Sequence, residues 1–251
     1  MVYPASVFIT GANRGIGFAL VQAFLKITVV QHVFAGVRNP DGAKDLKAIS
    51  DDRLKIVRID LENDQLIKNA YAQVENVVGD RGLNLLVNNA GVMSSYSTNG
   101  PISRRTLAKC INVNTLGTTI VSQTFLPLLK KASARVSNNH QGIDRAAIIN
   151  ISSGSGSISH NYYGSGSIGA LAYKISKAGV NQLGKTMAVD LAGDRIIVTQ
   201  FHPGWVQTDM GGRNAAITPT ESATSLVDSM SKLQKQHSGG FYDRHLNAVP
   251  Y

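Results

Sequence analysis

Residues 6–25 read SVFITGANRGIGFALVQAFL, and this stretch decides which fold the chain can adopt. The apolar run 6–10 is typical of a short buried strand, and residues 16–25 carry apolar side chains at helical spacing. Between them, the glycines of Gly-x-x-x-Gly-x-Gly at 11–17 would let the backbone approach a pyrophosphate at a helix N-terminus. This spacing differs from the commoner Gly-x-Gly-x-x-Gly fingerprint. The stretch predicts a strand, a dinucleotide-binding turn and a helix.

The same alternation of strand and helix patterns continues to the end of the chain. Strands are expected at 33–37, 54–59, 83–87, 146–151 and 196–201, and helices at 64–78, 102–129, 172–191 and 220–236. We expect the long helix to end or break near Pro127, and Thr218 or Thr220 to cap the last helix. The alternation predicts an α/β fold, a Rossmann-type doubly wound parallel sheet of about seven strands in three layers.

Composition indicates one domain over residues 1–251, since no change in composition marks a linker. The sequence contains no run of about 18 apolar residues, so we expect no membrane span. The single cysteine, Cys110, fits a reducing compartment, so we expect a cytoplasmic protein, and no Cys/His cluster suggests a metal site. The net charge of +9 comes from scattered basic residues, which argues against nucleic acid and fits attraction of a polyanionic cofactor.

Tyr173 and Lys177 lie four residues apart, which on a helix places both side chains on one face. An ammonium beside a phenol favours the phenolate and lowers its pKa from about 10. Bringing that pKa to about 7 needs roughly 4 kcal/mol. The pair alone is weak evidence for a catalytic site, because the same spacing occurs by chance on many surface helices.

Residues after the second and third strands bear on the choice of cofactor. Arg38 follows the second strand and no acid occurs before Asp41, which favours the 2′-phosphate of NADP(H) over the ribose hydroxyl of NAD. Arg14 could assist from the glycine turn, although Arg38 could also be a solvated turn residue. Asp60 is placed to hydrogen-bond an adenine edge, or else to cap the following helix. The sequence Asn-Asn-Ala-Gly at 88–91 leaves room for a cofactor, or forms an ordinary turn.

Together these residues resemble the short-chain dehydrogenase/reductase family, and not its extended branch, for which the chain is too short. The resemblance rests on the motifs Thr10–Gly17, Asp60, Asn88–Gly91, Asn114 in INVNTLG, Ser153 in INISS, Tyr173-x-x-x-Lys177 and PGWVQT at 203–208. Within the family the chain is most similar to sniffer-type carbonyl reductases and C-factor-like proteins. The segment 35–40, the Ser/Gly-rich insertion at about 154–171 and the ending 240–251 support that similarity.

The resemblance implies NADPH-dependent reduction of aldehydes, ketones or quinones to alcohols. It implies Tyr173 as general acid and Lys177 as the group that lowers the pKa of Tyr173 and bonds the nicotinamide ribose. Ser153 is implied as a hydrogen-bond donor to the carbonyl oxygen, and Asn114 as the holder of a relay water. The implied cofactor residues are Gly11, Asn13, Arg14, Gly15, Ile16, Gly17, Arg38, Asp60, Leu61, Asn89, Ala90, Gly91, Tyr173, Lys177, Pro203, Gly204, Val206 and Thr208.

The insertion is where the chain departs from the family pattern. Nineteen residues separate Ser153 from Tyr173, where about a dozen are common, so the register of the catalytic serine is open. We choose Ser153 because Ser152 would face the opposite side of an extended strand end. The insertion and segment 210–219 are expected to wall the substrate pocket, although a flexible surface insertion would have the same composition.

Other functions on the same fold stay open. An NADP-binding sensor would keep the cofactor site and act through a partner, and an alcohol or steroid dehydrogenase would run the reaction oxidatively. In many relatives the helices expected at 102–129 and 172–191 form a homodimer surface, which the insertion could alter or block. His202 is expected to be a structural residue.

Overall fold

The computed structural model describes residues 1–251, in which seven parallel strands form one sheet in the order β3-β2-β1-β4-β5-β6-β7. The strands are β1 (Ser6–Thr10), β2 (His32–Val37), β3 (Leu54–Arg58), β4 (Leu85–Asn88), β5 (Ala147–Ile151), β6 (Ile197–His202) and β7 (Phe241–Asp243). The order reverses between β1 and β4, which is where an open parallel sheet leaves a crevice for a ligand. The expected fold class is confirmed.

Alternate side chains along each strand pack into hydrophobic cores on opposite faces of the sheet. Val7 and Ile9 pack toward one face of the sheet with Val87, whereas Phe8 packs toward the other with Leu86. Both sets are fully buried because helices cover both faces. This two-sided burial explains why the strands read as continuous apolar runs in the sequence.

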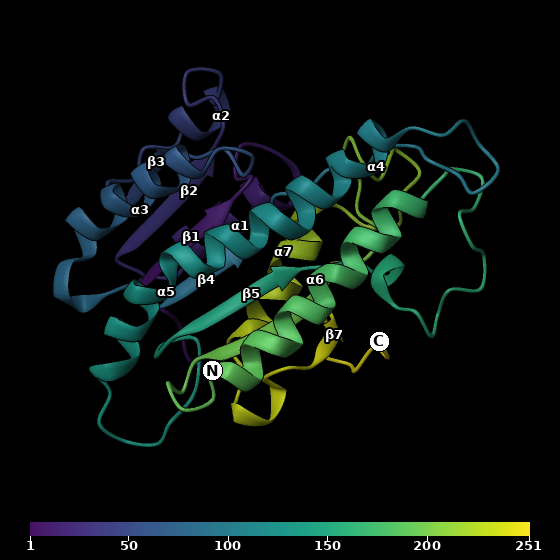
Figure 1. Ribbon diagram of the computed structural model, residues 1–251. Helices are drawn as coiled ribbons and strands as arrows, with labels where there is room; N and C mark the ends of the chain where they lie inside the picture. The colour runs from purple at the N-terminus through teal and green to yellow at the C-terminus, as the bar shows by residue number, and fades with distance from the viewer.

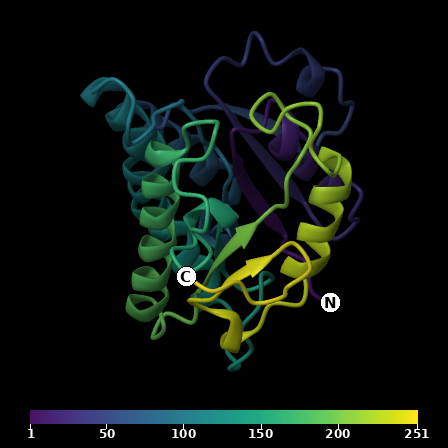
Figure 2. The ribbon, with the colours of Figure 1, turned by 90° about the vertical axis from the view of Figure 1, so that its right-hand side faces the viewer.

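The helices form the two outer layers (Figures 1 and 2). Helices α1 (Gly15–Leu25) and α7 (Pro219–Met230) pack together on one face, and short α2 (Lys44–Lys47) precedes β3. Helices α3 (Asp64–Val78), α4 (Arg104–Ile111), α5 (Thr118–Ala134) and α6 (Leu171–Asp190) lie on the other face. None of these helices combines the length and the apolar character needed to cross a membrane.

The expected end of the long helix near Pro127 is wrong. Pro127 lies inside α5, where its exposed position lets the ring face solvent while Phe125 and Leu128 are buried beside it. Core packing of that face compensates for the lost backbone hydrogen bond. The helix changes instead at residues 112–117, a π-helical segment between α4 and α5. Such segments inside helices are often found at functional sites.

The last helix, in contrast, ends earlier than expected, at Met230 and not near 236. Thr218 is its N-cap and forms a capping box with Glu221, which decides between the two expected caps. The chain then turns through residues 235–237 into β7. The early end frees the residues that complete the sheet beside β6.

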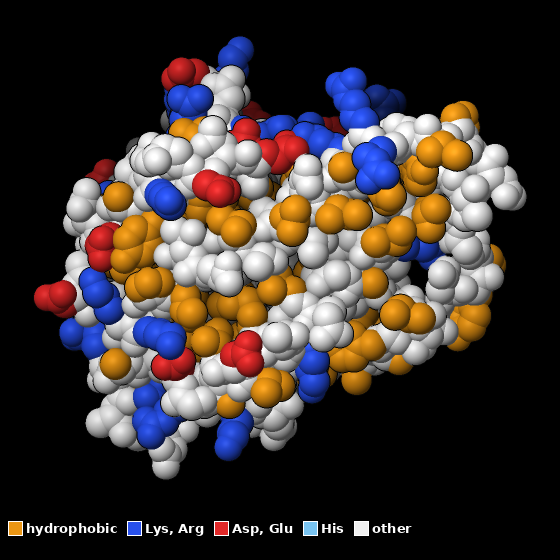
Figure 3. Space-filling model, viewed as in Figure 1, with side chains coloured by type: hydrophobic (Ala, Val, Ile, Leu, Met, Phe, Trp, Pro, Cys, Tyr) orange, Lys and Arg blue, Asp and Glu red, His pale blue; other side chains and the backbone are white.

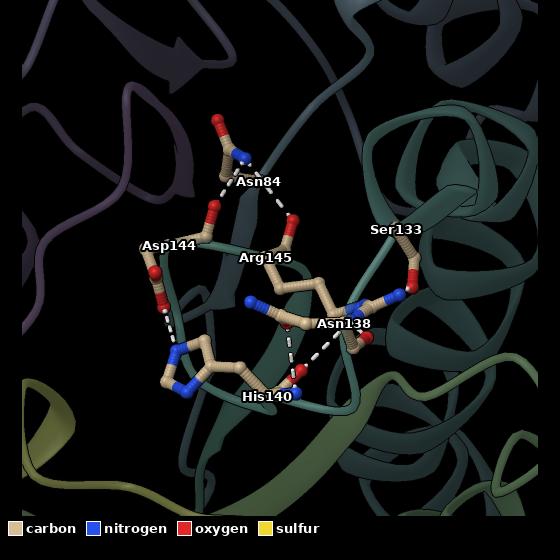
Figure 4. A network of polar contacts seen from close by, with 6 residues as sticks. All are labelled: Asn84, Ser133, Asn138, His140, Asp144 and Arg145. Carbon is tan, nitrogen blue, oxygen red and sulfur yellow. Dashed lines mark hydrogen bonds and ion pairs between the residues drawn. The ribbon is translucent and has the colours of Figure 1, made fainter. Parts of the chain in front are cut away.

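Residues 135–146 form the loop between α5 and β5, and a buried arginine organises it (Figure 4). The Arg145 guanidinium donates to Ser133 Oγ at 3.0 Å and to the Asn138 and His140 carbonyl oxygens, both at 2.8 Å. Burial lowers the pKa of Arg145. The loop supplies oxygen acceptors in place of a carboxylate, at the end of the sheet opposite the glycine turn.

Candidate active site

A cavity of about 1380 Å³ runs along the carboxyl ends of the strands. It is lined by every residue expected to hold the cofactor, from the glycine turn after β1 to the 203–208 segment after β6. Ser153 and the two ends of the insertion line the same cavity. The parallel sheet brings these segments to one edge because all its strands point the same way. Asn114 is not part of the lining.

The glycine turn is shaped for close backbone approach. A Cβ on Gly17 would lie 2.2 Å from the Gly11 carbonyl oxygen, and both Gly11 and Gly15 have positive φ. Arg14 occupies the N-cap position of α1 without any side-chain cap bond, and the first turn holds no acid. The free N–H groups of this helix end therefore fit a pyrophosphate.

Thr10 and Asn89 fasten β1 to β4 at the crevice. The Thr10 hydroxyl accepts from the backbone N–H groups of Asn89 and Ala90, both at 3.0 Å, and Asn89 Nδ2 donates to the Thr10 carbonyl oxygen at 2.9 Å. Asn89 and Ala90 of the Asn-Asn-Ala-Gly motif thus hydrogen-bond the end of β1 to the chain that follows β4. Its small residues face the glycine turn, since a Cβ on Gly11 would lie 2.9 Å from Ala90 Cα.

Two arginines line the end of the cavity beside β1 and β2. Arg38 is exposed immediately after β2 and has no acidic partner. Arg14 forms an exposed ion pair with Asp209 at 2.5 Å, across the mouth of the cavity. Asp60 also lines this end, and its carboxylate accepts only from the Glu62 N–H. Asn63 caps α3, so the alternative of Asp60 as that cap is wrong.

Tyr173 and Lys177 occupy the same face of α6, as their spacing predicts. The Lys177 Nζ lies 5.7 Å from the Tyr173 ring centroid and donates to the Ile151 carbonyl oxygen at 2.7 Å. Lys177 is 5% exposed, whereas Tyr173 is partly open to the cavity. Burial lowers the pKa of Lys177 to about 8.

The expectation that Lys177 lowers the pKa of Tyr173 is not met here. Burial raises the pKa of Tyr173 to about 12, and a hydrogen bond with Ser153 opposes that rise only in part. The physical reason is desolvation of the phenolate, while the ammonium is engaged with the Ile151 carbonyl. Tyr173 is therefore a protonated phenol at neutral pH. Cys110 lies close to it on α4, a neighbour that the sequence pattern did not indicate.

The two adjoining serines after β5 face different surroundings. The Ser152 hydroxyl is buried and donates to Asn181 Oδ1 on α6 at 2.6 Å. The Ser153 hydroxyl faces Tyr173 and accepts from the Ser155 N–H at 3.1 Å. Asn181 also donates to the Gly156 carbonyl oxygen at 3.2 Å, which ties the start of the insertion to α6. Ser153 therefore stays beside Tyr173 despite the length of the insertion.

Asn114 lies in the π-helical segment and is 1% exposed. Its side chain bonds both backbone groups of Val92, each at 2.8 Å, and donates to Ser176 Oγ at 2.9 Å. A Cβ on Gly91 would contact both Asn114 Oδ1 at 3.3 Å and Lys177 Nζ at 3.6 Å. Asn114 thus joins the strand end after β4 to the helix that carries Lys177.

The end of the cavity beside Tyr173 is walled by segments that follow β5 and β6. The insertion contributes residues 154–155 and Ile168, and the second segment contributes Trp205 and Met210. The insertion and segment 210–219, which includes Met210, were expected there. Trp205 and His202 also line the cavity, which was not expected of either residue. The Nδ1 of His202 is buried without a hydrogen-bond partner. No spacing in the sequence distinguishes these two residues.

Comparison with known proteins gives consistent results. The family model described as short chain dehydrogenase matches residues 5–217. The carbonyl reductase Sniffer of Drosophila melanogaster superposes with a TM-score of 0.95 at 36% identity, covering 99% of this chain and 100% of that one. An NADPH-bound carbonyl reductase from chicken fatty liver superposes with a TM-score of 0.94 at 34% identity, covering 100% and 96%. C-signal of Myxococcus xanthus is 31% identical over 67% of this chain and 93% of its own length.

Proposed function

The chain belongs to the short chain dehydrogenase family, and on that premise we propose that it reduces a carbonyl compound to an alcohol with NADPH. The observation that carries the proposal is the position of Tyr173, Lys177 and Ser153, which line one cavity together with a helix N-terminus suited to a pyrophosphate. The similarity to an NADPH-bound carbonyl reductase supports the same cofactor and reaction. The alternative sensor function would not need this proton-donating group.

Tyr173 is the proton donor. The phenol, whose pKa burial raises to about 12, keeps its proton at neutral pH. It transfers that proton to the carbonyl oxygen because the alkoxide that develops there is a stronger base than the phenolate. The Ser153 hydroxyl lies beside the phenol and donates a hydrogen bond to the same oxygen. The reduced nicotinamide, when bound, supplies the hydride.

Lys177 stabilises the tyrosinate that proton transfer leaves behind. Its ammonium is fixed near the Tyr173 ring by the Ile151 carbonyl, and the charge acts in a nearly water-free environment. Its donors also suit the ribose hydroxyls of the nicotinamide nucleotide. Asn114 keeps the strand end after β4 against this helix, and we propose that a water beside it relays protons to Lys177.

The other end of the cavity holds the adenosine phosphates. The uncapped N-terminus of α1 binds the pyrophosphate, Arg38 and Arg14 hold the 2′-phosphate, and Asp60 binds the adenine edge. Thr208 and the turn at 203–204 face the carboxamide. For Arg14 to reach a phosphate, it must release Asp209.

The substitution Tyr173→Phe tests the proposal. NADPH oxidation should be followed with quinones, aldehydes, diketones and ketosteroids, and kcat/KM should fall by about 100- to 10,000-fold in the variant. NADPH binding should be retained, as measured by quenching of Trp205, the single tryptophan, which lines the cavity. Tyr163→Phe is the matched control, because that side chain is 85% exposed on the insertion.

Each outcome of this experiment has a distinct meaning. Near-full activity of Tyr173→Phe would remove Tyr173 as the proton donor. Tight NADPH binding by the wild type without turnover of any carbonyl would favour the sensor. Faster turnover of alcohols with NADP⁺ than of carbonyls with NADPH would favour the oxidative direction.

A further inference from the structure

Two segments that lie far apart in the sequence are fastened to each other beside the substrate end of the cavity. The Ser157 hydroxyl donates to the Pro250 carbonyl oxygen at 2.6 Å, and the Ser159 N–H donates to the Tyr251 carbonyl oxygen at 3.0 Å. Figures 1 and 2 both show the chain end marked C next to the start of the insertion. The residues that open the insertion are therefore held by segment 248–251.

Tyr251 anchors that segment to the sheet. Its hydroxyl donates to the Gly239 carbonyl oxygen at 2.6 Å and accepts from Gln200 Nε2 at 3.1 Å. Its ring stacks on Phe241 of β7 with 5.9 Å between centroids. The Val249 N–H also bonds the Phe241 carbonyl oxygen. The anchor is built from β6 and β7, which are rigid parts of the fold.

Gln200 continues this connection into the core. Asn150 Nδ2 on β5 donates to Gln200 Oε1 at 3.4 Å, and Asn88 Nδ2 on β4 donates to Asn150 Oδ1 at 2.9 Å. All three amides are buried at the carboxyl halves of adjacent strands. The Tyr251 hydroxyl is thus the outer end of a row of side-chain hydrogen bonds that crosses the sheet beneath the cavity.

The insertion is held at a second place near its other end. The Tyr96 N–H donates to the Gly169 carbonyl oxygen at 2.7 Å, and the Leu171 N–H donates to the Tyr96 carbonyl oxygen at 3.1 Å. Between the two fastenings, Tyr162 and Tyr163 are 75% and 85% exposed. Figure 3 shows an opening at the right-hand end of the molecule, where the insertion leaves the body. The middle of the insertion has only exposed side-chain contacts with the body, from Ser165 to Thr98 and from Asn161 to Lys174, so the backbone bonds at its two fastenings are its main ties.

We propose that Tyr251 is a positioning residue for the carbonyl substrate, because it fixes the insertion wall that shares the cavity with Tyr173. The inference rests on the proposed function of that cavity. Loss of the Tyr251 hydroxyl would leave the Gly239 carbonyl without this donor and would loosen the segment that binds Ser157 and Ser159. Most cofactor contacts follow β1 to β4, and those at 203–208 come after the end of β6, beyond Gln200, so they should not be affected.

The substitution Tyr251→Phe tests this role against Tyr242→Phe, which removes a phenol hydroxyl in adjacent β7 that has no hydrogen-bond partner within the protein. Loss of one hydrogen bond corresponds to about a fivefold change in an equilibrium. We expect the KM for a bulky carbonyl to rise about fivefold in Tyr251→Phe, with kcat within about twofold and the KM for NADPH unchanged. Amide hydrogen exchange at Ser159 should accelerate by a similar factor.

Ser159→Ala keeps Tyr251 in place and removes only the insertion's side-chain contact with it. Ser159→Ala should raise the KM for the carbonyl, but by less than Tyr251→Phe does. The proposal would be overturned if Tyr251→Phe and Tyr242→Phe had the same amide hydrogen exchange at Ser159 and the same KM for the carbonyl. It would also be overturned if Tyr251→Phe raised the KM for NADPH as much as the KM for the carbonyl. If the wild type reduced no carbonyl, the proposed function would fail, but the exchange measurement would still decide whether Tyr251 holds the insertion.

Discussion

At the scale of single residues, burial has opposite effects on the two titratable groups of the site. It raises the pKa of Tyr173 to about 12 and lowers the pKa of Lys177 to about 8. Both groups hold their protons at pH 7, which suits reduction, where a proton is delivered to oxygen. The ordinary lysine pKa of 10.5 applies to the unfolded chain, so this burial opposes folding at neutral pH. That cost decreases as the pH rises from about 8 to 10.5.

The lowered pKa of Lys177 predicts how the reaction depends on pH. With saturating NADPH and carbonyl, kcat should be level near pH 7 and fall above about pH 8, because Lys177 then loses the charge that stabilises the tyrosinate. Initial rates between pH 6 and pH 10 would measure this. In Lys177→Arg the guanidinium stays protonated, so any residual activity should lack this fall. A wild-type rate that stays level up to pH 10 would contradict the assignment.

Arg38 should decide between the two nicotinamide cofactors. In Arg38→Ala the Kd for NADPH should rise about tenfold or more, since a hydrogen bond to a charged group contributes about 1.5–3 kcal/mol. The Kd for NADH should change less than about twofold, because NADH carries no 2′-phosphate. Titration of Trp205 fluorescence measures both constants. Arg58→Ala removes an exposed arginine that does not line the cavity and should leave both unchanged. Equal weakening of both cofactors by Arg38→Ala would show that Arg38 does not bind the 2′-phosphate.

At the scale of elements, α6 combines catalysis and positioning on one face. Tyr173, Lys177 and Asn181 follow at intervals of four, so they point to the same strand ends. Asn181 holds the start of the insertion, and Gly184, one turn further, lies against the buried amide row. The helix therefore sets where Ser153 and the insertion lie relative to Tyr173.

Gly184 should not tolerate a methyl group. A Cβ there would lie 1.8 Å from Gln200 Oε1 and 3.0 Å from Asn150 Nδ2. Alanine gains about 1 kcal/mol in helix propensity, but overpacking costs about 1–3 kcal/mol, so Gly184→Ala should lower the free energy of unfolding. Urea titration followed by circular dichroism measures the change. Gly193→Ala is the control, because a Cβ at that position meets nothing within 4 Å. Equal stability of the two variants would contradict the packing argument.

At the scale of the whole molecule, the site is assembled from segments spread over most of the chain. The cavity lining runs from Gly11 to Pro219, and segment 248–251 supports one of its walls. Hydrophobic side chains also gather over the face formed by α5 and α6, with charged side chains mainly around its edge (Figure 3). That face includes the exposed Leu116 and Ile175, which lie on the surface expected to pair in a homodimer.

A single domain predicts one cooperative unfolding transition, because both cores share the same sheet. NADPH at about 100 times its Kd should stabilise the fold by about 2.7 kcal/mol and raise Tm by about 5–10 °C. Scanning calorimetry measures both effects. NADH at the same concentration should raise Tm less in the wild type, and this difference should become smaller in Arg38→Ala, where only Arg14 remains to hold the 2′-phosphate. Two separate transitions would show that the chain folds as two units.

The sequence predicted most helices and strands because the spacing of apolar residues reflects which side chains are buried. The helix at 64–78 was predicted to the residue, and both faces of its neighbouring strands are covered, which explains their unbroken apolar runs. The expectation for Pro127 was wrong because packing of α5 outweighs one missing hydrogen bond. The alternative cap at Asp60 was wrong because Asn63 lies closer to the helix start and accepts from Leu66.

The sequence alone determined the fold class, the phosphate-binding turn and the Tyr173–Lys177 pair, since each depends on residues close together in the chain. Tertiary structure decided the rest. It raised the pKa of Tyr173, paired Arg14 with Asp209 and joined Tyr251 to the insertion. These features depend on desolvation and on contacts between residues far apart in sequence, and no local spacing records either of them.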